Sequence, residues 1–137
     1  MRRYLLDSTL VAAYLHGRKA PLDLITPWII KREVATSILV YAEVTEYIKS
    51  LPDFPRRHNA LRELLNEIYP YFLTYSILER YADIRRLLRP PQGPGIIGDI
   101  DTLIAATALE RELTLVTADS DFERVPGLSM MRVTLKL

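Results

Sequence analysis

The chain has 137 residues, a mass of 15.8 kDa and a net charge of +1, which is the size of one domain. Its 49% hydrophobic and 26% charged residues argue against a mainly disordered chain. The absence of cysteine excludes disulfides, a thiolate nucleophile and a thiolate zinc site. No apolar run approaches the ~20 residues of a membrane span, and Asp7 comes too early for a secretory signal. We therefore expect one cytoplasmic domain over residues 1–137 and no membrane association.

Basic residues gather in four short clusters, although the net charge neither requires nor excludes nucleic acid as a partner. They can form a positive rim around an acidic centre, which would hold RNA phosphates, or they can simply be solvated helix faces. The clusters are Arg2-Arg3, Lys31-Arg32, Arg56-Arg57-His58, and Arg85-Arg86 with Arg89.

The first half of the chain begins with a short apolar run, Tyr4-Leu5-Leu6, which predicts a buried strand. A helix over residues 8–16 should follow, capped by Ser8 or Thr9 and ended by Gly17. We expect a weakly specified helix over 22–30, a strand over 33–36 and a helix that Ser37 caps and that runs to residue 50.

The second half continues the alternation, with helices expected over 57–68, 78–88 and from Asp99 or Asp101 to 111. Strands are expected over 71–74, 113–117 and 131–135, and a Pro- and Gly-rich loop over 90–95. Strands that alternate with helices indicate an α/β fold with a mostly parallel sheet, covered on both faces.

Two aspartates follow expected strands directly or nearly so. Asp7 comes after the first strand, and Asp119 comes two residues after the strand that ends at Thr117. If these strands are neighbours, both carboxylates lie at one edge of the sheet, where the chemistry of parallel sheets usually gathers. The ordinary alternatives are a helix cap for Asp7 and turn chemistry for Asp119 and Asp121.

Two further carboxylates fall on helices. Glu43 lies inside or beside the apolar stripe of its helix, formed by Val40, Val44, Tyr47 and Leu51, although a rim glutamate with a basic partner is an equal alternative. Asp101 shares a face with Ile104 and Ala105 and should point inward, whereas Asp99 is expected to cap that helix.

Carboxylates that converge would repel one another unless a cation lies between them. Oxygen donors without cysteine or a histidine pair suit Mg²⁺ or Mn²⁺, which can support phosphodiester hydrolysis. We expect His16 and His58, the only histidines, to be surface residues.

The ordered motifs resemble the PIN-domain family over essentially the whole chain, and residues 122–128 are similar to the end of its VapC-type toxins. The motifs are Leu5-Leu6-Asp7-Ser8-Thr9, Ala42-Glu43, Asp101-Thr102-Leu103-Ile104-Ala105-Ala106 and Leu115-Val116-Thr117-Ala118-Asp119. The family commonly has Thr-Asn after its first aspartate, where this chain has Ser8-Thr9.

The resemblance implies a three-layer α/β/α domain that is an Mg²⁺- or Mn²⁺-dependent endoribonuclease. It also implies a homodimer and a VapB-type antitoxin, for which a groove along the early helices is the expected place. Asp7, Asp101 and Asp119 would hold the metal, and Glu43 would complete the site. The accessory candidates are Ser8, Asp99, Asp121 and Thr117.

The sequence fits three other functions less well. A haloacid-dehalogenase-type phosphatase needs a second aspartate where Thr9 stands, and a receiver domain needs a late lysine at a strand end, where only Lys136 is available. A non-catalytic PIN-like module that binds RNA or protein is the stronger alternative. For the dimer, we expect apolar helix faces around Leu39, Tyr41 and Tyr47 to take part.

Overall fold

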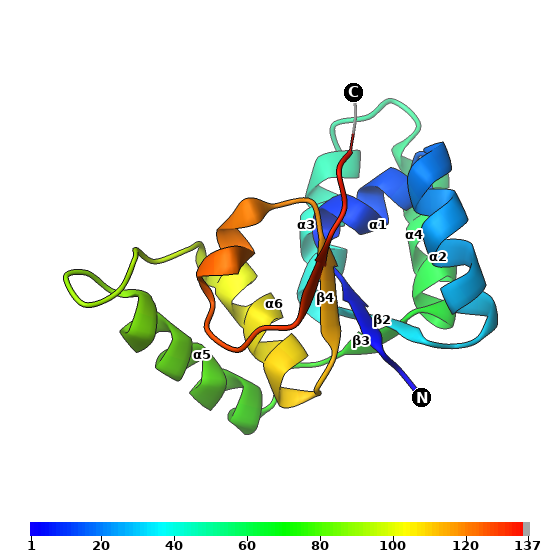
Figure 1. The fold of residues 1–137 in the computed structure, drawn as a ribbon. Coiled ribbons are helices and arrows are strands. Elements are labelled where there is room, and N and C mark those ends of the chain that lie inside the picture. The colour runs from blue at the N-terminus through cyan, green and yellow to red at the C-terminus, as the bar shows by residue number, and fades with distance from the viewer. Residues whose placement is uncertain (136–137) are drawn as a thin grey trace.

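The computed structural model describes residues 1–135, which contain a five-stranded, entirely parallel sheet. The strand order is β3-β2-β1-β4-β5, so the first strand lies at the centre (Figure 1). The strands are β1 (Tyr4–Leu6), β2 (Val34–Ser37), β3 (Tyr69–Tyr71), β4 (Thr114–Thr117) and β5 (Met130–Arg132).

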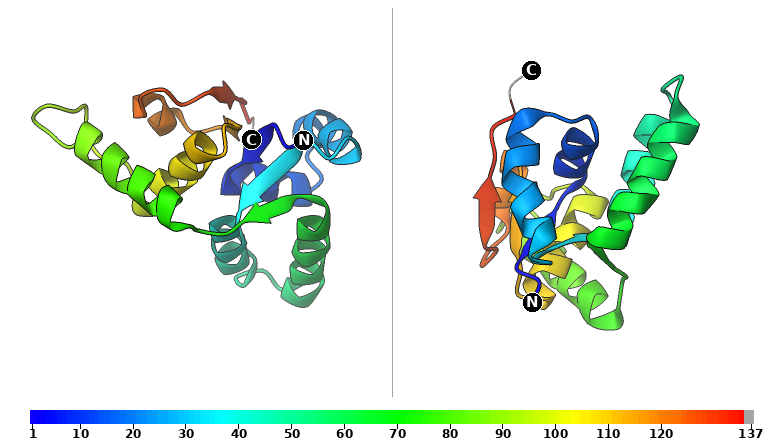
Figure 2. Two further views of the ribbon diagram at one scale, coloured as in Figure 1. Left: turned by 90° about the horizontal axis from the view of Figure 1, so that it is seen from below. Right: turned by 90° about the vertical axis from the view of Figure 1, so that its right-hand side faces the viewer.

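Helices cover both faces of this sheet, as expected for a three-layer α/β/α fold. In Figure 1, α5 and α6 lie to the left of the sheet, and α1 and α2 lie to the right. The α3–α4 pair lies side by side and ends in a turn beyond the sheet (Figure 2). The helices are α1 (Ser8–Leu15), α2 (Lys19–Ile30), α3 (Ile38–Ile48), α4 (Phe54–Glu67), α5 (Tyr75–Leu88), α6 (Asp99–Glu110) and the 3₁₀ helix η1 (Ser120–Arg124).

The core lies around the central strands, because a parallel sheet between two helical layers is buried on both faces. Leu5, Leu6, Val34, Leu115 and Val116 have no exposed surface. Among residues 1–135, no helix has the length and apolar character needed to cross a membrane.

Several element boundaries differ from the predictions. β3 covers Tyr69–Tyr71, and not 71–74, because Pro70 is tolerated in an edge strand whose N–H groups on one side have no partner strand. α4 begins at Phe54, since Pro55 suits the first turn of a helix, which has no need of its N–H. β5 ends at Arg132, before the predicted residue 135.

Candidate active site

The candidate site lies where β1 and β4 end, at the upper edge of the sheet in Figure 1. The two strands are hydrogen-bonded neighbours, with Leu6 opposite Val116, and the Asp7 amide donates to the Val116 carbonyl at 3.3 Å. The expectation that they are neighbours is therefore confirmed. Asp7 and Asp119 follow strands that end at the same edge.

Asp7 is almost completely buried, with 4% of its surface exposed. One carboxylate oxygen, Oδ1, accepts a hydrogen bond from the Leu10 amide at 3.1 Å. The other, Oδ2, accepts from the Thr117 hydroxyl. Asp7 is thus the N-cap of α1, and the prediction that Ser8 or Thr9 would cap this helix is wrong.

Thr117 links Asp7 to Asp119. Its hydroxyl donates to Asp7 and accepts from the Asp119 amide at 3.0 Å. Asp119 is half-buried, and its Oδ1 accepts from the Asp121 amide at 2.9 Å, so it caps η1. Asp121 itself is exposed and lies 3.6 Å from the Arg124 guanidinium.

Glu43 reaches the site from α3 and is half-buried, at the edge of the apolar face as predicted. Its Oε1 accepts a hydrogen bond from the Ser8 hydroxyl of α1. The apolar stripe differs from the prediction, because Ile48 is buried with Val40 and Val44, whereas Tyr47 is 47% exposed. Val40, Val44 and Ile48 are four residues apart, so they form one ridge along α3, and this ridge packs against the neighbouring helices.

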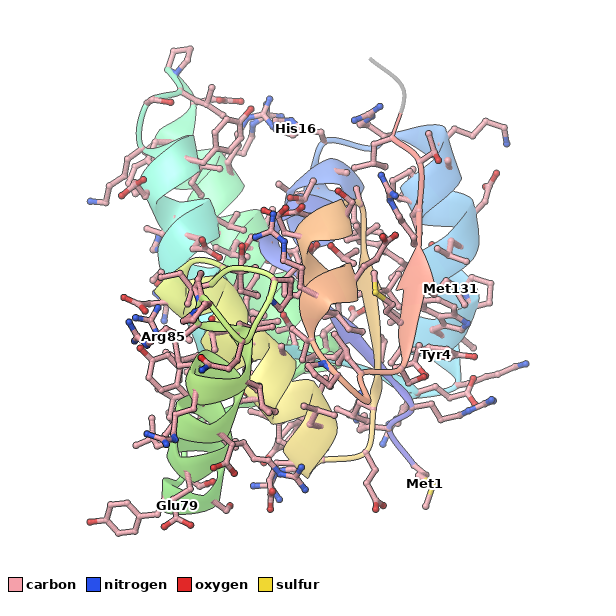
Figure 3. The ribbon with its side chains drawn as sticks, turned by 60° about the vertical axis from the view of Figure 1, so that its left-hand side comes forward. Met1, Tyr4, His16, Glu79, Arg85 and Met131 are labelled. Carbon is pink, nitrogen blue, oxygen red and sulfur yellow. The ribbon has the colours of Figure 1, made fainter. Side chains whose placement is uncertain are left out.

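The two aspartates of α6 point to different surroundings. Asp101 is half-buried and senses the charges of the other site carboxylates. Asp99 instead accepts hydrogen bonds from the Tyr81 hydroxyl and the Arg85 guanidinium of α5, both at 2.9 Å. Gly98 occupies the cap position of α6, so the prediction that Asp99 caps this helix is wrong. Figure 3 labels Arg85 on the α5 side of the molecule.

Burial shifts the titration of two site carboxyls. It raises the pKa of Asp7 from 3.8 to about 6, against the hydrogen bonds from Thr117 and Leu10, and the charges of Asp119 and Glu43 raise it further. Burial also raises the pKa of Asp101 to about 6, and the charges of Glu43, Asp119, Asp7 and Asp121 contribute in that order. The negative charges of Asp7, Glu43, Asp101 and Asp119 therefore act on one another, and no positive side chain among their described contacts offsets them.

The oxygen donors of the site are of the type that binds a hard divalent cation, although they do not form a complete coordination shell. Within residues 1–135, no group of three or more His, Cys, Asp or Glu side chains is arranged to hold a metal ion. Mg²⁺ usually keeps several waters and takes only one or two protein carboxylates directly. Asp7, Glu43, Asp101 and Asp119 offer oxygen donors of this kind without a basic partner among their described contacts.

The basic clusters and histidines have more internal contacts than the sequence suggested. Arg2 donates to the Val34 carbonyl at 2.6 Å, and Arg57 pairs with Asp53 at 2.9 Å. His58, which was expected at the surface, is half-buried, and its Nε2 lies 2.7 Å from the Tyr41 hydroxyl, so only part of the side chain is exposed. His16 is exposed, as predicted.

In a comparison with models of protein families, the family described as PIN domain matches residues 4–128 of the sequence. The chain belongs to the PIN-domain family. Its four candidate acids, from Asp7 to Asp119, lie within the matched segment of this PIN domain. A search of curated proteins returned no match.

Solved structures share the fold of this PIN domain at low sequence identity. A chain of VapBC2 from Rickettsia felis, bound to a DNA fragment from its promoter, has a TM-score of 0.83 at 22% identity, over 95% of this chain and 98% of that one. A chain of DNA-bound VapBC from Salmonella typhimurium has a TM-score of 0.79 at 19% identity, over 96% and 98%. VapBC-1 from nontypeable Haemophilus influenzae gives 0.76 at 20% identity, over 94% and 96%. The expected PIN-like fold is confirmed.

Proposed function

We propose that this PIN domain is a metal-dependent endoribonuclease and the toxin of a VapBC-type toxin–antitoxin pair. The observation that carries the proposal is the set of partly or fully buried carboxylates at the ends of β1 and β4, with the pKa values of Asp7 and Asp101 raised to about 6. Perturbed carboxyls at one sheet edge are typical of a functional site. The similar folds in VapBC complexes support the toxin assignment.

Asp7, Asp101 and Asp119 would hold Mg²⁺, or Mn²⁺ in its place, directly or through water. Such an ion supplies Lewis-acid activation of water and neutralises charge on the phosphodiester. The chain's own groups set the geometry. Thr117 holds the carboxylate of Asp7 and the backbone of Asp119 in fixed relation.

Glu43 would orient the attacking water or take its proton. Ser8 donates to Oε1 of Glu43, which fixes the carboxylate and leaves its second oxygen to accept a further hydrogen bond. Ser8 and Thr117 therefore act as positioning residues. Asp121 and Asp99 are assigned to the periphery, because their described partners are Arg124 in one case and Arg85 and Tyr81 in the other.

The partners we assign are RNA, a VapB-type antitoxin and a second copy of the chain, in the cytoplasm. The VapBC assemblies of similar fold support the antitoxin. Of the expected dimer face, Tyr41 and Tyr47 contact His58 and His16 of the same chain, and Leu39 is half-buried. Light scattering at micromolar concentration should give the mass of a dimer, and the mass of a monomer would contradict this assignment.

The test of the function is cleavage of total cellular RNA by the purified protein with Mn²⁺, with EDTA and as Asp7→Asn. We expect discrete fragments that need the ion and are absent with the variant. Asp83→Asn, at an exposed position of α5, is the matched control and should cut as the wild type does. Equal cutting by Asp7→Asn would contradict the proposed site.

A non-catalytic PIN-like module that binds RNA or protein is the second candidate. The same assay separates the two functions, because a binding module would leave the RNA intact with Mn²⁺ present.

A further inference from the structure

A groove between α1 and α3 opens beside the candidate active site. Its volume of about 330 Å³ is within the range of small-ligand pockets. Ser8 and Glu43 line one end, so the groove is continuous with the acidic site. The residues used below are Ser8, Glu43, Val44, His16, Arg18 and Tyr47, all of which line it.

Hydrogen bonds around His16 determine what Tyr47 presents to the groove. Nη1 of Arg57 lies 3.0 Å from Nδ1 of His16, and a guanidinium can only donate, so Nδ1 accepts. A neutral imidazole then carries its proton on Nε2, which donates to the Tyr47 hydroxyl at 3.1 Å. The Tyr47 hydroxyl has no other hydrogen bond within residues 1–135, so its own proton is available to a ligand. Figure 3 shows His16 at the end of α1, facing the α3–α4 pair.

The chemistry of the groove suits one nucleotide. Tyr47 is 47% exposed and lines the groove together with the apolar residue Val44, so its ring is available for a base to stack on. Arg18 supplies a positive charge for a phosphate, and no ion pair within residues 1–135 involves it. A stacking face and a cation without an ion-pair partner in the described residues are the groups by which proteins bind single-stranded nucleic acid.

We propose that this groove is a nucleotide subsite, which binds one nucleotide of the RNA next to the phosphodiester that is cut. The base stacks on the Tyr47 ring, the hydroxyl in the plane of that ring donates to a ribose or phosphate oxygen of the strand, and Arg18 binds the adjacent phosphate. The inference rests on the proposed nuclease function. Continuity with Glu43 and the positive charge favour RNA over a protein segment as the occupant.

The test measures binding separately from cleavage. A fluorescent single-stranded RNA of mixed sequence is titrated with the Asp101→Asn protein in EDTA, and anisotropy gives the Kd. Adding Tyr47→Ala or Arg18→Gln should raise the Kd about tenfold, the size expected for the loss of one stacked base or one phosphate contact. Tyr75→Ala and Arg62→Gln, exposed on α5 and α4, are matched controls and should leave the Kd unchanged.

Tyr47→Phe separates stacking from hydrogen bonding. It keeps the ring, so it should bind the mixed RNA more tightly than Tyr47→Ala does. It should also bind oligo-A, -C, -G and -U less tightly than the wild type by a similar factor, because the lost donor contacts the RNA backbone and not a base edge. If Tyr47→Ala fails to fold, as judged by its circular dichroism melt, Tyr47→Phe and Arg18→Gln decide the question.

Cleavage assays show whether only the nucleotide subsite or also the nuclease function is contradicted. Metal-dependent cutting together with an unchanged Kd for Tyr47→Ala and Arg18→Gln would overturn the subsite and leave the nuclease standing; a protein segment would then be the better occupant. A wild type that neither cuts with Mn²⁺ nor binds RNA would overturn both proposals.

Discussion

The carboxyl group of Asp7 is buried, so ionising it costs free energy. Its side chain is buried at the ends of β1 and β4, yet the Leu10 amide and the Thr117 hydroxyl both donate to it. Burial outweighs these bonds and raises its pKa to about 6. Asp7 thus caps α1 and at neutral pH carries a buried negative charge that destabilises the fold. A bound cation would offset this charge.

The raised pKa predicts a pH dependence in metal-free protein. The folded state holds the Asp7 proton up to about pH 6, whereas the unfolded chain releases it near 3.8. Asp7 therefore stabilises the fold fully below 3.8, and this contribution of about 3 kcal/mol is lost as the pH rises through 6. In EDTA, urea denaturation should show the wild type losing stability relative to Asp7→Asn over this range. A pH-independent difference would contradict the assignment.

Thr117 supports two site residues with one hydroxyl. Thr117→Val should cost about 1–3 kcal/mol, because the buried Asp7 carboxylate loses a donor and the Asp119 amide loses its acceptor. Thr114→Val is the matched control on the same strand, where the hydroxyl only meets Ser129 at an exposed position. Equal free energies of unfolding for the two variants would show that the Thr117 bridge does not stabilise the fold.

At the scale of elements, α5 and α6 form a pair that places Asp101. Asp99 joins the start of α6 to Arg85 and Tyr81 of α5, while Asp101, two residues later, turns toward the site. A helix can divide two nearby carboxylates in this way because residues two apart point in different directions.

This division predicts different outcomes for two conservative variants. Asp99→Asn should cost only about 0.2–1 kcal/mol, since its side chain is 68% exposed and screened by water. Its RNA cleavage rate should equal that of the wild type. Asp101→Asn should lower the rate about a hundredfold or more. A comparable loss in Asp99→Asn would place that residue in the site.

At the scale of the whole molecule, the parallel sheet brings together groups that lie far apart in the chain. Asp7 and Thr117 are 110 residues apart, and Ser8 and Glu43 are 35 apart, yet each pair is hydrogen-bonded. Their convergence makes the site a property of the folded domain, so ion binding and folding should be coupled.

The coupling predicts that Mn²⁺ stabilises the protein at neutral pH. An ion at a hundred times its Kd should add about 2.7 kcal/mol, or several degrees in Tm by scanning calorimetry. Asp7→Asn should lose most of this shift, whereas Asp83→Asn, exposed on α5, should keep it. A Tm that Mn²⁺ leaves unchanged in the wild type would favour the binding module.

The sequence alone indicated the α/β alternation, the parallel sheet and the four acids, because strand runs, caps and carboxylates at strand ends are local features. It could not place β3, because Pro70 is tolerated in a strand only if that strand lies at the edge of the sheet. It also could not show that Asp99 is not a helix cap, because the hydrogen-bond partners of Asp99 are on α5. The stripe of α3 was misassigned at Tyr47 for the same reason: its exposure depends on which helices pack against α3.

What the sequence determined by itself was therefore the order of elements and the candidate residues for the chemistry, because these follow from side-chain type and spacing. Only the tertiary structure decided that β1 and β4 are neighbours, that Thr117 holds Asp7, and that a groove with Tyr47 and Arg18 adjoins Glu43. Long-range strand pairing and helix packing create these contacts, and their energies depend on burial and charge that arise only when distant segments meet.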